Sequence, residues 1–96
     1  MNENKIIVIT DPVSYFQRIL ALVDGKLVDQ LGVSQDDLTE TIDAFVAKYN
    51  ATQIDVTGPK TYAMKYVQQL SDPTKYSNLT VNYCEMRGKT NGKVSN

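Results

Sequence analysis

The chain has 96 residues, 42% of them hydrophobic and 22% charged, and its formal net charge is −1. These values are typical of one small globular domain with a single hydrophobic core. They exclude strong general attraction to nucleic acid, and no apolar run reaches the roughly 18 residues of a membrane span. The polar N-terminus has no signal-peptide pattern, so we expect a cytoplasmic protein with no membrane partner. Nucleic acid stays open as a partner without being indicated.

The sequence contains no histidine and one cysteine, Cys84. The absence of histidine removes the commonest general base and excludes a Ser-His or Cys-His nucleophile. One cysteine cannot form an internal disulfide, and Cys84 is expected to be a packed or half-exposed structural residue. Without histidine, any catalysis would depend on carboxylates, lysine, tyrosine or a bound hard cation. No motif indicates a resident metal or cofactor.

The first expected element is a β-strand over residues 5–10, KIIVIT. A continuous apolar run of this length is typical of a strand that is covered on both faces. Asp11-Pro12 ends it.

Residues 13–33 allow two interpretations. Asp11 can cap a helix with Pro12 in its first turn, and the apolar side chains from Phe16 onwards fit a helical stripe. Asp24-Gly25 between two apolar runs instead predicts a β-hairpin, because both residues tolerate positive φ. We favour the hairpin, since a glycine within so long a helix would cost about 1 kcal/mol.

Residues 34–50 show the clearest helical pattern. Ser34 is the expected N-cap, with Asp37 three residues later as a variant of the capping box, and Asn50 is the expected C-terminal residue. The apolar side chains recur on one face, at Leu38, Ile42, Phe45, Val46 and Tyr49.

Residues 52–70 predict a central strand, a Gly58-Pro59 turn and a second helix. In the strand, Ile54 and Val56 alternate with polar residues, and Val56 is expected to be among the most buried residues. The helix from Thr61 presents one apolar face, made of Tyr62, Ala63, Tyr66, Val67 and Leu70. Tyr62 and Tyr66 are candidate interface residues, because tyrosine is enriched at interfaces. Alternatively, they edge the core with their hydroxyls in water.

Residues 79–84 alternate strictly and predict a last strand. Residues 1–85 are therefore expected to form one α/β domain, and residues 86–96 a disordered tail. The order β-β-β-α-β-α-β predicts a mixed five-stranded sheet with two helices, antiparallel on one side and parallel on the other.

This order resembles the core of the ribonuclease H-like superfamily, which includes Holliday-junction resolvases and actin-like proteins. The resemblance is one of topology over residues 5–84, with two local motifs: Asp11-Pro12 after the first strand and the small-residue turn after the fourth. Nucleases of the superfamily hold two divalent cations with carboxylates from several elements. The resemblance implies Asp11 on the first strand, Asp37 or Glu40 at the first helix, and Asp55 on the fourth strand. The chain departs from the pattern at the end of that strand, where there is no carboxylate.

Two functions are carried forward. The first is a small non-catalytic domain without cofactor that binds a macromolecule, either a protein partner or a second copy, as suits an accessory protein of a phage or mobile element. The alternative is a metal-dependent nuclease that uses Mg²⁺ or Mn²⁺ at Asp11, Asp37 or Glu40, and Asp55. The missing histidine, the absence of a phosphate loop and the incomplete acid set favour the first.

Overall fold

A computed structural model describes residues 3–76 and 78–85. Its elements are β1 (Asn4–Ile9), β2 (Phe16–Val23), β3 (Lys26–Ser34), the 3₁₀ turn η1 (Gln35–Asp37), α1 (Leu38–Tyr49), β4 (Gln53–Thr57), α2 (Lys60–Leu70) and β5 (Thr80–Tyr83). This is the order that the sequence predicts. The predicted tail, residues 86–96, lies outside the described residues.

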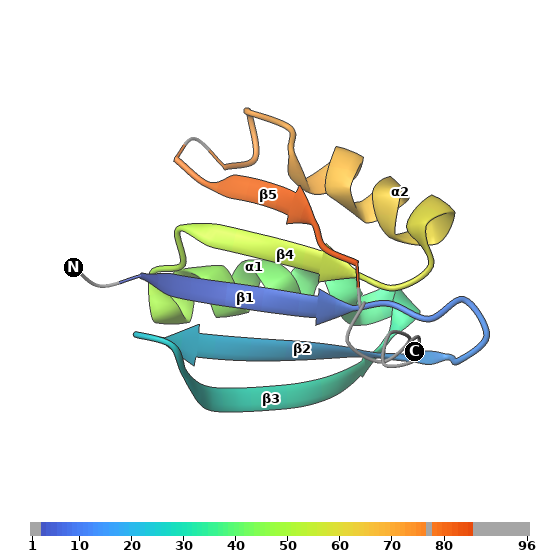
Figure 1. The fold of residues 1–96 in the computed structure, drawn as a ribbon, viewed down its shortest axis with the longest axis horizontal. Helices are drawn as coiled ribbons and strands as arrows, with labels where there is room; N and C mark the ends of the chain where they lie inside the picture. Colours follow the sequence, from blue (N-terminus) through green and yellow to red (C-terminus); the bar gives the residue numbers. More distant parts are fainter. Residues whose placement is uncertain (1–2, 77, 86–96) are drawn as a thin grey trace, which may run out of the picture.

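The five strands form one sheet in the order β3-β2-β1-β4-β5 (Figure 1). Strand β2 is antiparallel to both β1 and β3, whereas β1, β4 and β5 run parallel to one another. The expected α/β class is therefore confirmed, with a mixed sheet that is antiparallel on one side and parallel on the other.

The β2–β3 hairpin settles the two interpretations of residues 13–33. Asp24 has φ 53° and Gly25 has φ 81°, as a two-residue hairpin turn of type I′ requires. The helix alternative is wrong, because β2 begins at Phe16. Asp11 caps no helix, and its Oδ1 accepts the backbone N–H of Val13 at 2.9 Å in a local turn.

The start of α1 differs from the prediction. Ser34 is the last residue of β3, and the η1 turn separates it from α1. Its hydroxyl donates to Asp37 Oδ2 at 3.2 Å and does not accept a helix N–H, so the capping box is wrong. The extended chain must turn sharply to pass beneath the sheet, and the tighter 3₁₀ geometry makes that turn. Asn50 ends the helix in the left-handed conformation, as predicted.

The hydrophobic core lies between the sheet and the two helices. Connections β3–α1–β4 and β4–α2–β5 step across the sheet in the same direction, so right-handed crossovers place both helices on one face. Figure 1 shows α1 behind the sheet. One cluster joins buried side chains of every element except η1 and β5: Ile6, Val8, Ile19, Ala21, Val33, Leu38, Ile42, Phe45, Ile54, Val56, Ala63 and Leu70. Val56 is fully buried, as predicted.

The opposite face of the sheet carries no helix in the described part of the chain. In β1, Ile6 and Val8 are fully buried, whereas Ile7 and Ile9 are only half-buried. The prediction that residues 5–10 are covered on both faces is therefore wrong for the described residues. An apolar run looks the same whether helices cover it or it forms an apolar surface. We call this side of the sheet the open face.

Candidate interaction surface

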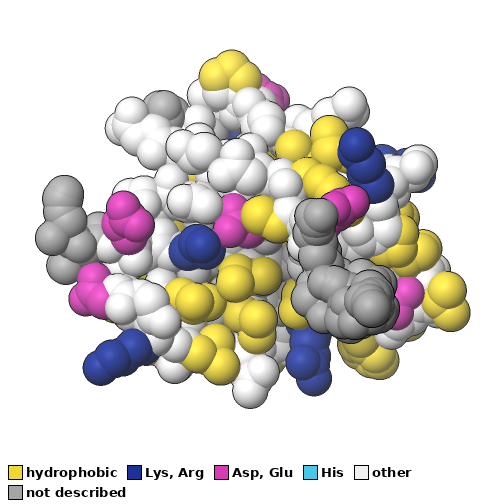
Figure 2. Space-filling view, in the orientation of Figure 1, with side chains coloured by type: hydrophobic (Ala, Val, Ile, Leu, Met, Phe, Trp, Pro, Cys, Tyr) yellow, Lys and Arg dark blue, Asp and Glu magenta, His cyan; other side chains and the backbone are white. Residues whose placement is uncertain are grey.

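The open face has an apolar half and a polar half. Strand pairing sets its side chains in cross-strand rows: Leu22, Lys5 and Gln53; Leu20, Ile7 and Asp55; Arg18, Ile9 and Thr57. The apolar members belong to β1 and β2, and the uncharged and acidic polar members to β4. Figure 2 views this face and shows hydrophobic side chains gathered over β1, β2 and β3 beside a basic and an acidic side chain.

Asp55 is the central polar group of the open face, and its charge is matched by its neighbours. The residue is 8% exposed. Its carboxylate lies 3.2 Å from Lys5 Nζ and accepts the Gln53 side-chain amide at 2.8 Å. A nearly buried carboxylate needs such a partner and such hydrogen bonds. The ion pair between Asp55 on β4 and Lys5 on β1 therefore links these two neighbouring strands.

Cys84 lies beside Asp55, just after β5. Its thiol is exposed, and partial burial together with the negative charge of Asp55 raises its pKa. A raised pKa lowers the thiolate fraction, and the thiolate is the reactive form. This environment disfavours a reactive thiol, and the side chain is exposed rather than packed.

The structure does not bring the four candidate nuclease carboxylates together. Strand β1 pairs Ile7 with Asp55, so Asp11 lies four residues further along, roughly 13 Å at the strand rise. Asp37 and Glu40 are exposed where η1 passes into α1. Among the described residues, no group of three or more Asp, Glu, Cys or His side chains is placed to hold a metal ion.

Tyr62 and Tyr66 are half-buried neighbours on α2, with ring centroids 5.6 Å apart in an edge-to-face arrangement. Tyr62 Oη accepts the side-chain amide of Gln35 at 2.8 Å, and the two hydroxyls are 3.5 Å apart. Burial, followed by the bond to Tyr62, raises the pKa of Tyr66 to about 12. The hydrogen bond between Gln35 and Tyr62 joins η1 to α2, so the hydroxyls of the two tyrosines make contacts within the domain.

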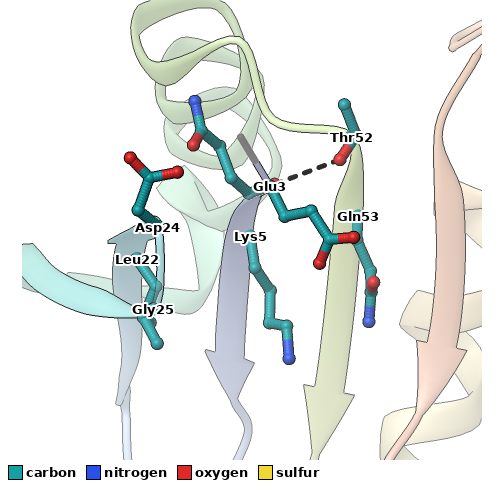
Figure 3. A pocket seen from close by; sticks show the side chains of 8 residues that line it. Glu3, Lys5, Leu22, Asp24, Gly25, Thr52 and Gln53 are labelled. Carbon is teal, nitrogen blue, oxygen red and sulfur yellow. Dashed lines mark hydrogen bonds between the residues drawn. The ribbon is translucent and has the colours of Figure 1, made fainter. Parts of the chain in front are cut away.

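A pocket of about 450 Å³ lies where β1 and β4 begin, beside the β2–β3 turn (Figure 3). Its walls include the first row of the open face, together with the acidic residues Glu3 and Asp24. Charges of both signs line it, so they specify no single ligand chemistry. The pocket is therefore continuous with the open face, at the end of the sheet where β1 and β4 begin.

The exposed hydrophobic side chains concentrate on the edge strand β3 and on the segment that enters β2. Six large ones are exposed among the described residues, and all lie between positions 13 and 31: Val13, Tyr15, Phe16, Leu27, Val28 and Leu31. Three belong to β3, and the others to the segment that enters β2. We call these six residues the apolar edge. Sequence reasoning missed it, although Leu27-Val28 already breaks the alternation expected of a half-buried strand.

Comparison of the chain with protein-family models, with curated proteins and with solved structures finds no match. Within residues 3–76 and 78–85, no helix has the length and apolar character needed to cross a membrane. With no match to a known protein, the apolar edge is the feature of the described residues that points to a function.

Proposed function

We propose that this chain is a non-catalytic domain that acts by binding another protein at its apolar edge. The supporting observation is that every exposed large hydrophobic side chain of the described residues lies on β3 or on the segment that enters β2. Exposed apolar side chains that gather in one region of a surface mark interaction sites, whereas single scattered ones are normal. The edge strand β3 adds a row of backbone N–H and C=O groups without strand partners on its outer side.

The proposed domain has a ribonuclease H-like topology. The strand order and the positions of the two crossover helices support this assignment. Asp55, the acid on β4, is neutralised by Lys5, and Asp11 is separated from it along β1. These contacts favour binding over the alternative nuclease function, because two-metal catalysis requires converging carboxylates.

The test is affinity capture from cells of the native host with three immobilised proteins. They are the wild type, the double variant Val28→Lys/Leu31→Lys, and the matched control Gln68→Lys/Gln69→Lys on the exposed side of α2. Both variants add two positive charges, and thermal melting checks that each is folded. We expect the wild type and the control to retain the same protein, whether another copy or a different chain, and the β3 variant to lose it. Equal retention by all three, or no retained protein, contradicts the proposal.

A further inference from the structure

We infer that the protein bound at the apolar edge is a second copy of this chain, and that the two β3 strands pair antiparallel to form one continuous sheet. Each copy would contribute its five strands. The inference rests on the proposed function and identifies its partner.

Strand β3 has few of the features by which proteins protect a sheet edge. Those features include short strands, prolines and charged side chains along the edge. Strand β3 has nine residues without proline, and Lys26 and Asp29 are its only charged residues. Asp29 Oδ2 accepts the Tyr49 hydroxyl at 2.6 Å, so its carboxylate is held toward α1. The register shift with β2 lies near the hairpin, which leaves residues 29–34 regular.

Strand β5, at the other edge of the sheet, is less suited to pairing with a strand of another chain. Strand β5 has four residues, and its open-face side chains are the polar Thr80 and Asn82. On β3, by contrast, Leu27, Val28 and Leu31 are 54%, 50% and 47% exposed. Pairing at β3 would bury these side chains and satisfy outward backbone groups together, and neither gain is matched at β5.

Side-chain alternation restricts the register of the pairing. Directly opposite residues must point to the same side of the sheet, so the two-fold axis has to pass through a residue. An axis at Asp29 sets two carboxylates opposite each other, and an axis at Gln30 sets Asp29 against a leucine. An axis at Leu31 sets the two exposed Leu31 side chains together and places Gln30 opposite Gly32, where there is no side chain to obstruct it. Asp29 then lies opposite Val33, whose side chain is already buried in the core of its own copy. We therefore place the axis at Leu31.

The charges at the ends of β3 complement each other in this arrangement. Lys26 begins the strand, and Asp36 and Asp37 follow its end; all three are exposed. Antiparallel pairing about Leu31 brings Lys26 of each copy alongside the acidic turn of the other. Two-fold symmetry repeats the contact at both ends, so unlike charges favour self-association in this direction.

The mass in solution is the first measurement. Light scattering after size exclusion of the full chain should give twice the 10.7 kDa of one copy. Val28→Lys/Leu31→Lys should raise the dimer dissociation constant at least about tenfold, since about 1.4 kcal/mol of interface energy suffices for that change. Gln68→Lys/Gln69→Lys should leave it unchanged. A dimer that is insensitive to the β3 variant overturns the inference.

The register is tested by cross-linking in a Cys84→Ser background, which removes the native thiol. Leu31→Cys should form an interchain disulfide under mild oxidation, because paired residues have Cβ atoms about 4.5–5.5 Å apart, close to disulfide geometry. Thr80→Cys on the β5 edge is the control and should stay reduced. Equal cross-linking of the two, or none at Leu31→Cys, overturns the pairing.

The mass and capture measurements together separate this inference from the proposed function. A monomer that captures a different protein through β3 overturns the second-copy inference and leaves the binding function standing. A monomer that captures nothing overturns both.

Discussion

Two adjacent isoleucines on β1 show how differently the two faces of the sheet are used. Ile6 is fully buried beneath the helices, whereas Ile7 is half-buried on the open face beside Leu20 and Asp55. The side chains are identical, and the strand pleat alone sends them to opposite sides. Ile6 therefore stabilises the fold of one copy, while Ile7 contributes mainly to a surface.

The two edges of the sheet also differ in length and in how many apolar side chains they expose. Strand β5 is short and polar on its open side, and its neighbour α2 packs along it. Strand β3 is more than twice as long and exposes three large aliphatic side chains. The apolar half of the open face and the apolar edge thus lie on the antiparallel side of the sheet, and the polar half lies on the parallel side.

The largest expected effect is the difference in stability between alanine variants of the two isoleucines. Ile6→Ala should lower the free energy of unfolding by about 2–5 kcal/mol, because it leaves a cavity in the core. For a domain of this size, the melting temperature should fall by roughly 10–30 °C. Ile7→Ala should cost only about 1 kcal/mol, because its side chain already contacts solvent. Calorimetry of both variants measures the difference, and equal losses would show that the open face is as tightly covered as the core.

An intermediate effect is expected in alkaline solution, on the helix-covered side. Tyr66 ionises near pH 10 when unfolded, but its pKa is about 12 when folded. Below pH 10 it is neutral in both states. Between pH 10 and about 12 only the unfolded state loses the proton, so stability should fall as pH rises. Burial and the Asp43 carboxylate raise the pKa of Tyr76 as well, which adds to the fall.

Urea unfolding at a series of alkaline pH values measures this decline. Tyr66→Phe should show a shallower fall above pH 10, because the variant has one fewer group to ionise on unfolding. Tyr15→Phe, at an exposed position on the apolar edge, is the control and should follow the wild-type curve. A Tyr66→Phe curve as steep as that of the wild type would contradict the burial of this hydroxyl.

The smallest effect concerns the polar half of the open face. Asp55→Asn removes a negative charge that raises the pKa of the Cys84 thiol, so alkylation by iodoacetamide near neutral pH should become a few-fold faster. Asp72→Asn, in the turn after α2, should not change the rate. An unchanged or slower rate in Asp55→Asn would mean that the two side chains are not neighbours in solution.

Local chemistry in the sequence was sufficient for much of the fold. The positive φ values of Asp24 and Gly25 follow from residue type, and the periodic apolar positions of α1 identify its buried face. Asn50 ended the helix as its tolerance of the left-handed region predicts. Ser34 precedes η1 with the extended φ and ψ of an N-cap, but its hydroxyl donates to Asp37 Oδ2 and accepts no backbone N–H of the following turn.

The sequence by itself determined the main helices and strands, their order and the core-facing side chains of α1 and β4, because each depends on spacing of 2 or 3.6 residues along a short segment. Tertiary structure decided which apolar residues stay exposed, and it keeps the four candidate nuclease carboxylates apart. Ile7 lies in an apolar run like Ile6, and Leu31 alternates like Val33, yet their exposure depends on helices packing on one face and on β3 lying at an edge. These are properties of strand order and crossover direction, and no single segment of the sequence carries them.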